Sequence, residues 1–167
     1  MSFGWAYILI GWLVVQRLAE LAYARKNTQA LLARGGREIG AEHYPLFVLL
    51  HASWLITLAV LTAPAPPVPW LLLGAFVLLQ AARIWVIATL GPYWTTRIIT
   101  VPDAPLIKGG PFWFVRHPNY VVVVLEIPLV PLVLGLEWVG LIFGTANLAL
   151  LAYRIRVEDR ALQPRRA

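Results

Sequence analysis

Five consecutive residues, Arg116-His117-Pro118-Asn119-Tyr120, place a guanidinium, an imidazole and a phenol directly before an apolar stretch. Pro118 suits the first turn of a helix, where its missing N–H has no helical partner. Arg116 and His117 would then lie at the positive N-terminal end of that helix, which can hold an anionic group such as a carboxylate. Alternatively, Arg116 extends to a membrane surface and the neighbouring aromatic residues form an interfacial belt.

A second charged group lies further along the chain. Arg154 and Glu158 are four residues apart and share one face of a helix, with Asp159 beside them. The apolar block between the two groups, residues 120–153, is long enough for two helices and is interrupted near Gly135. A tight turn there would bring the outer ends of both helices together, so we expect the two groups to meet. The alternative is a solvated, salt-bridged helix end, which we prefer for the other arginines of this segment: Arg156, Arg160, Arg165 and Arg166.

The composition indicates a membrane protein. Of the 167 residues, 60% are hydrophobic and only 13% are charged, whereas soluble domains have about 25% charged residues. The absence of cysteine excludes disulfides, thiolate metal sites and a cysteine nucleophile. The three histidines, at positions 43, 51 and 117, do not have the spacing of metal ligands, so we expect no metal.

Five apolar stretches approach the 20 residues that a helix needs to cross a bilayer. They cover about residues 3–23, 44–63, 68–90, 120–136 and 138–153, and the last two form a hairpin around Gly135 and Glu137. The proline-rich residues 63–69 are too few for anything but a tight reversal. We therefore predict an all-α, polytopic membrane helix bundle with about five transmembrane helices, forming one domain over residues 1–167.

The positions of the basic residues predict the orientation of this bundle. Of the 14 Lys and Arg residues, 12 lie in segments 24–43, 91–119 and 154–167, which all fall on one side of the predicted membrane. Because basic loops remain in the cytoplasm, the N-terminus is predicted outside and the C-terminus inside. The net charge of +6 is then explained without a nucleic-acid partner, and a cytosolic reactant would meet its polar partners on the basic side.

Charged residues inside the predicted spans are candidates for function, since burying them in lipid is costly. Arg17 and Glu20 have the spacing of a local pair near a helix end, where Arg17 could extend to the membrane surface. Arg83 could line a cavity or pair with Glu126, which could also form a pocket floor. We interpret His51 as a hydrogen-bonded packing residue.

Two motifs together resemble the isoprenylcysteine carboxyl methyltransferase family of integral membrane enzymes. They are Gly110-Pro-Phe-Trp-Phe-Val-Arg-His-Pro-Asn-Tyr120 and Arg154-Ile-Arg-Val-Glu-Asp-Arg-Ala-Leu162, and the resemblance covers about residues 80–162. The first half of the chain is similar to the small bacterial branch. The resemblance implies S-adenosylmethionine as cofactor, a hydrophobic acceptor such as an isoprenylcysteine-type carboxylate or a polyketide-derived hydroxyl, and a bacterial inner membrane with the active site facing the cytoplasm.

The resemblance also implies roles for individual residues. His117, Pro118, Tyr120, Glu158 and Asp159 would bind the cofactor, His117 and Tyr120 at its amino-acid end and the two acids at its ribose hydroxyls or amino group. The catalytic residues would be two arginines: Arg154 would orient the acceptor oxygen, and Arg116 would share that task or hold the site together.

Three alternatives remain open at this point. An Arg-His-Pro-Asn-Tyr element also occurs in membrane reductases that use NADPH, although the distal Arg-x-x-x-Glu-Asp pattern favours the methyltransferase. Phospholipid N-methylation is a close variant, and a non-enzymatic membrane subunit is the third alternative. We expect the lipid part of any acceptor to enter sideways between the first, third and fourth spans.

Overall fold

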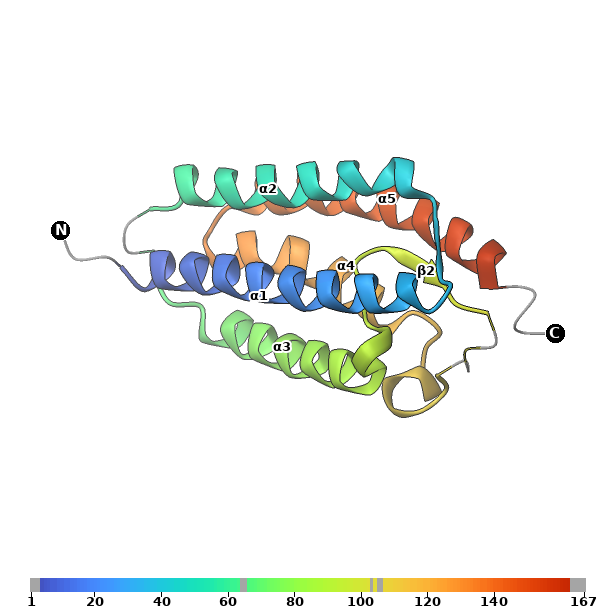
Figure 1. Ribbon diagram of the computed structural model, residues 1–167. Coiled ribbons are helices and arrows are strands. Elements are labelled where there is room, and N and C mark those ends of the chain that lie inside the picture. Colours follow the sequence, from blue (N-terminus) through green and yellow to red (C-terminus); the bar gives the residue numbers. More distant parts are fainter. Residues whose placement is uncertain (1–3, 64–65, 103, 105–106, 163–167) are drawn as a thin grey trace.

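The computed structural model describes residues 4–63, 66–102, 104 and 107–162, so Arg165, Arg166 and part of the proline-rich reversal lie outside the described residues. Figure 1 shows a bundle of five α-helices, which confirms the predicted all-α class. The helices are α1 (Trp5–Ala33), α2 (Tyr44–Leu61), α3 (Trp70–Leu90), α4 (Pro118–Val133) and α5 (Glu137–Leu162). The connections contain a two-stranded antiparallel sheet of β1 (Arg37–Ile39) and β2 (Ile98–Thr100), and the short 3-10 helices η1 (Ala41–His43), η2 (Gly91–Tyr93) and η3 (Gly110–Trp113).

Four of these helices, α1, α2, α3 and α5, are long and apolar enough to cross a membrane. The apolar helix α4 has 16 residues and is shorter, about 24 Å at 1.5 Å per residue. Large apolar side chains point outward from the bundle: Leu71 is 87% exposed, Val60 73% and Leu78 72%. These side chains face the acyl chains of lipids, and the chain is an integral membrane protein.

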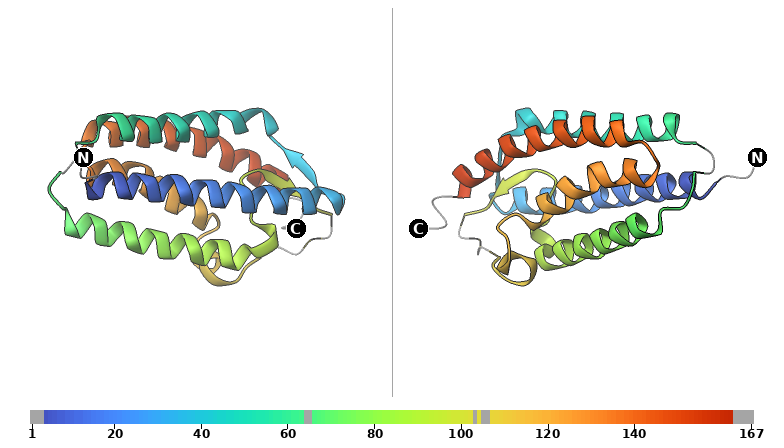
Figure 2. Two further views of the ribbon diagram at one scale, coloured as in Figure 1. Left: turned by 60° about the vertical axis from the view of Figure 1, so that its left-hand side comes forward. Right: turned by 180° about the vertical axis from the view of Figure 1, so that it is seen from behind.

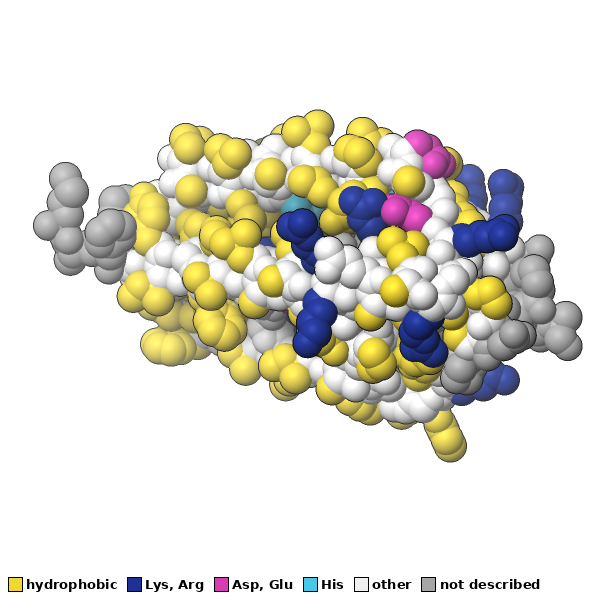
Figure 3. Space-filling model, in the orientation of Figure 1, with side chains coloured by type: hydrophobic (Ala, Val, Ile, Leu, Met, Phe, Trp, Pro, Cys, Tyr) yellow, Lys and Arg dark blue, Asp and Glu magenta, His cyan; other side chains and the backbone are white. Residues whose placement is uncertain are grey.

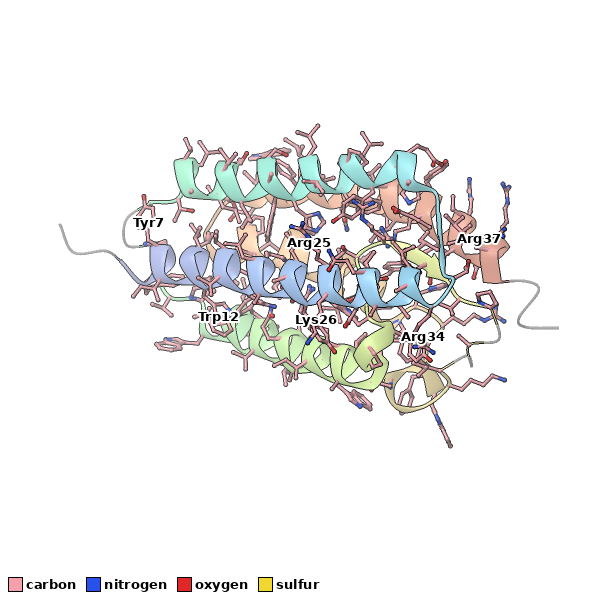
Figure 4. All side chains as sticks on the ribbon, viewed as in Figure 1. Tyr7, Trp12, Arg25, Lys26, Arg34 and Arg37 are labelled. Carbon is pink, nitrogen blue, oxygen red and sulfur yellow. The ribbon has the colours of Figure 1, made fainter. Side chains whose placement is uncertain are left out.

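Helix α1 continues to Ala33, ten residues beyond the end expected for the first span. The extension buries Ala24, Asn27 and Leu31 on one face, while Arg25 and Lys26 point outward, as Figure 4 shows. The Asn27 side-chain amide donates to the carbonyl oxygens of Gly91 (3.1 Å) and Trp94 (2.8 Å). The polar end of α1 is therefore held against the segment that follows α3, and this contact keeps it helical.

The hairpin of α4 and α5 determines the position of the site. It turns at Gly135, whose φ of 73° is readily adopted only by glycine. Two glycines of α5 allow it to approach Pro128 closely, because a Cβ on Gly140 would lie 3.0 Å from the Pro128 carbonyl oxygen and one on Gly144 would lie 3.3 Å from Pro128 Cβ. The first turn of α4 consequently lies beside the last turns of α5.

The polar connections gather at one end of the bundle. In Figures 1 and 2 the strands, η3 and the end of α5 all lie at this end, and α4 lies between α3 and α5. In the view of Figure 3, the Lys and Arg side chains lie from the middle of the molecule toward this end, whereas the opposite end shows hydrophobic side chains and no Lys or Arg among the described residues. This is the distribution that the orientation rule for membrane proteins describes, and the cytoplasmic location of the basic end stays a prediction.

Candidate active site

A cavity of about 420 Å³ lies inside the bundle near its basic end. This volume falls within the range of pockets that hold small molecules. One end of the cavity is lined by residues that begin α4 and end α5, and the other, deeper end is lined by charged residues of α1 and α3. Between these ends the wall is apolar, with Phe47, Leu55, Val123 and Leu151.

The hydroxyl of Tyr120 is the centre of the polar end. It donates a short hydrogen bond to the Glu158 carboxylate and accepts one from Arg154 Nε at 2.8 Å. Arg154 Nη2 donates to the carbonyl oxygen of Thr96 at 2.8 Å, and the guanidinium lies 5.3 Å from the centre of the Phe47 ring. Arg154 is only 7% exposed. Its guanidinium is held in place by two hydrogen-bond acceptors and by the face of the Phe47 ring. Neither of these two hydrogen bonds uses Nη1, the other terminal nitrogen of Arg154.

His117 packs against this centre and connects it to the acidic pair. Its ring stacks on the Tyr120 ring, with centroids 5.3 Å apart and an angle of 18° between the planes. His117 Nε2 lies 3.2 Å from Asp159 Oδ1, and Nδ1 lies 3.8 Å from Glu158 Oε1. One imidazole therefore bridges two neighbouring carboxylates across the helix hairpin.

The structure brings together five of the seven site residues suggested by the sequence: His117, Tyr120, Arg154, Glu158 and Asp159. Pro118 is buried as the first residue of α4. Arg116 is exposed at the rim of the cavity, and among the described residues its guanidinium has no ion pair. The roles of all seven residues stay predictions.

Sequence reasoning missed the wall supplied by the β1–β2 region and the start of α2. Arg97 Nη1 donates to both oxygens of Glu38, at 2.7 and 2.9 Å, and its guanidinium lies 4.4 Å from the centre of the Tyr44 ring. The Tyr44 hydroxyl lies 3.2 Å from Thr96 Oγ1. The run of aromatic residues and threonines at 93–96 was the available signal, but only the fold places it against Arg154.

Two cations and two anions meet at the deep end of the cavity, which Arg17, Glu20 and Arg83 line and behind which Glu126 lies. Glu126, fully buried, accepts short hydrogen bonds from Arg17 and Arg83 and a third of 2.7 Å from Gln80 Nε2. Glu20 Oε2 lies 2.7 Å from Arg17 Nη1 and 3.4 Å from Arg83 Nη1. We call Arg17, Glu20, Arg83 and Glu126 the buried charge cluster. The expected pairing of Arg83 with Glu126 is present, whereas Arg17 turns into the bundle instead of extending to the membrane surface, because Glu126 attracts it there.

Several residues that line the cavity are exposed at the surface of the bundle on α1 and α2. They are Leu18 (62% exposed) and Leu21 (43%) of α1 and Val48 (49%) of α2. Figure 3 shows a histidine side chain at the surface between these two helices. On the side of α1 that faces α3, Gln16 Nε2 donates to Gln80 Oε1 at 2.7 Å, and the expected entry between the first, third and fourth spans stays a prediction.

Comparisons with known proteins agree with the motif that was found in the sequence. A family model described as "Isoprenylcysteine carboxyl methyltransferase (ICMT) family" matches residues 70–164. The chain is 41% identical to the uncharacterized protein YpbQ of Bacillus subtilis, covering 94% of this chain and 96% of that protein. It is 24% identical to an uncharacterized protein of Haemophilus influenzae, covering 87% and 88% of the two chains. No solved structure matches the chain.

Proposed function

This chain belongs to the isoprenylcysteine carboxyl methyltransferase family, and from that premise we propose that it transfers the methyl group of S-adenosylmethionine to an oxygen atom of a hydrophobic, lipid-like acceptor. The observation that carries the proposal is the hydrogen-bonded chain from Arg154 through Tyr120 to Glu158, at the end of a cavity whose lining includes exposed apolar side chains of α1 and α2. We place the protein in a bacterial inner membrane with this end facing the cytoplasm, because the basic segments gather there.

The residues of the polar end fit the chemical groups of the cofactor. S-adenosylmethionine has an amino group, ribose hydroxyls and a carboxylate, and when bound it supplies a methyl group on a cationic sulfur. Glu158 and Asp159 are suited to the amino group or the hydroxyls, and His117 and Tyr120 to the amino-acid end. Pro118 fixes the start of α4, so that the two aromatic rings keep their stacked arrangement.

Positioning accounts for most of the proposed catalysis. Methyl transfer from a sulfonium is an in-line displacement, so the protein must align the acceptor oxygen and exclude water. Arg154 is held by Tyr120 and Thr96, and its Nη1 can orient the acceptor oxygen through a charge-assisted hydrogen bond. Arg116, at the rim, can share this task or retain the anionic part of a ligand as it enters.

Binding of S-adenosylhomocysteine to the detergent-purified protein tests this proposal. We expect the product to raise the thermal unfolding midpoint of the wild type, and His117→Ala to weaken its Kd about tenfold or more, since the stacked imidazole next to both acids is lost. The matched control is His43→Ala, which removes a buried imidazole that does not line the cavity. Stabilisation by NADPH but not by S-adenosylhomocysteine would favour the reductase and contradict the proposal.

A further inference from the structure

A second hollow, which we call the hairpin groove, lies on the outer side of the α4–α5 hairpin and has a volume of about 270 Å³. Val121 (45% exposed) and Leu125 (48%) line it from α4, and Ile155 lines it from α5. Val121 and Leu125 are four residues apart, so they share one face of the helix. The side chains that α4 buries inside the bundle, such as Val122 and Glu126, do not line it. The groove is therefore an apolar surface on the side of α4 that faces lipid.

The hairpin groove has a cation at its basic end. Arg116, directly before α4, lines the groove and is exposed, and its guanidinium takes part in none of the ion pairs of the described residues. His117 also lines it, but Glu158 and Asp159 lie 3.8 and 3.2 Å from the nitrogens of its ring. Arg116 is consequently the charged group of the lining that is available to a ligand.

Exposed tryptophans indicate the depth of Arg116 in the membrane. Trp113 and Phe114 in the connection before α4 are each 80% exposed at the basic end, where Figure 1 shows η3. At the other end, Trp70 (79%) and Trp138 (76%) lie in the first turns of α3 and α5. Because exposed tryptophans of membrane proteins gather at the two interfaces with water, Arg116, two residues beyond Phe114, lies at the level of the lipid headgroups.

The length of the hairpin groove completes the description of its ligand. From Pro118 to Leu125 helix α4 rises about 10 Å, which reaches from the headgroups into the hydrocarbon core. A ligand that fits has a negative charge at one end, for Arg116, and a hydrocarbon chain that extends along Val121 and Leu125. Basic pockets between membrane helices bind the headgroups of anionic lipids in this way.

We propose that the hairpin groove binds one anionic phospholipid. Its phosphate contacts the Arg116 guanidinium, which can donate two parallel hydrogen bonds to phosphate oxygens. One acyl chain lies along Val121 and Leu125. His117 and Tyr120 line both the groove and the cavity, so the lipid packs on the outer side of this stacked pair. The binding does not depend on methyl transfer, and it can be measured without S-adenosylmethionine.

Native mass spectrometry of the detergent-purified protein tests this proposal. The probes are phosphatidylglycerol and phosphatidylcholine with the same acyl chains, which differ in net charge. We expect the first phosphatidylglycerol to bind the wild type about fivefold or more tighter than phosphatidylcholine. Arg116→Gln should abolish this preference, whereas Arg116→Lys should keep most of it. Leu125→Trp should weaken the binding of both lipids, because the indole occupies the space of the acyl chain.

Matched controls are available on the same surface. Arg156→Gln removes an exposed arginine of α5, and Val77→Trp enlarges an exposed apolar side chain of α3; neither residue lines the hairpin groove. Both variants should bind the two lipids like the wild type, and circular dichroism checks that every variant is folded. Equal binding of the two lipids, or a preference that survives in Arg116→Gln, overturns the proposal. Displacement of phosphatidylglycerol by millimolar inorganic phosphate also overturns it, because the site would then hold a free anion.

Discussion

Replacing Glu126 by Gln is expected to lower the free energy of unfolding by about 3–5 kcal/mol, because it leaves buried cations without their counter-ion. Glu126 is fully buried and accepts hydrogen bonds from Arg17, Arg83 and Gln80. Gln at this position has one acceptor oxygen, and its amide N–H groups would point at other donors. Equilibrium unfolding in mild detergent, followed by circular dichroism, measures the change.

Two further variants test whether the charge balance of the buried charge cluster determines the stability of the protein. Glu42→Gln removes an exposed carboxylate and should change the unfolding free energy little. The double variant Arg17→Gln/Glu126→Gln leaves Arg83 paired with Glu20, so it should be more stable than Glu126→Gln alone. If Glu126→Gln unfolds like the Glu42→Gln control, Glu126 is not the counter-ion that holds α1, α3 and α4 together.

Replacing Arg154 by Lys is expected to lower kcat for methyl transfer by about 10²- to 10³-fold while the protein remains folded. The Arg154 guanidinium donates at the same time to Tyr120 and to the Thr96 carbonyl, and in our proposal it also orients the acceptor. The single ammonium group of lysine cannot donate in these directions at once as the planar guanidinium does. Steady-state kinetics with labelled S-adenosylmethionine and 4-dodecylphenol measure the loss.

Arg156→Lys is the matched control, because Arg156 is an exposed arginine on the same helix. It should keep wild-type kinetics. Binding of S-adenosylhomocysteine distinguishes a catalytic role from a structural one: Arg154→Lys should change its Kd far less than it changes kcat. A parallel loss of cofactor binding and turnover would instead mean that Arg154 only maintains the shape of the site.

The sequence was most informative about the α4–α5 hairpin. Two apolar stretches interrupted at Gly135, with charged residues at both outer ends, are enough to predict that His117 and Glu158 approach each other. The reasoning is local, since the length of the turn and the periodicity of a helix determine which residues can meet. The structure places these two side chains 3.8 Å apart, between Nδ1 and Oε1.

Features that depend on contacts between distant segments could not be predicted in the same way. The polar end of α1 resembles a loop in sequence, and only the bonds from Asn27 to the segment after α3 show why it stays helical. Arg17 has a local partner in Glu20, so its turn toward Glu126 depends on how the helices pack. The hydrogen bond from Gln16 on α1 to Gln80 on α3 likewise joins residues 64 positions apart in the chain.

The central claim is that the cavity end formed by Tyr120, Arg154 and Glu158 binds the methyl donor. A structure of the purified protein with S-adenosylhomocysteine, determined in detergent or lipid nanodiscs, tests this claim most directly. We expect the ligand in the 420 Å³ cavity, in contact with Glu158 or Asp159 and beside the Tyr120 ring. A bound ligand elsewhere on the protein, with this cavity end empty, would contradict it.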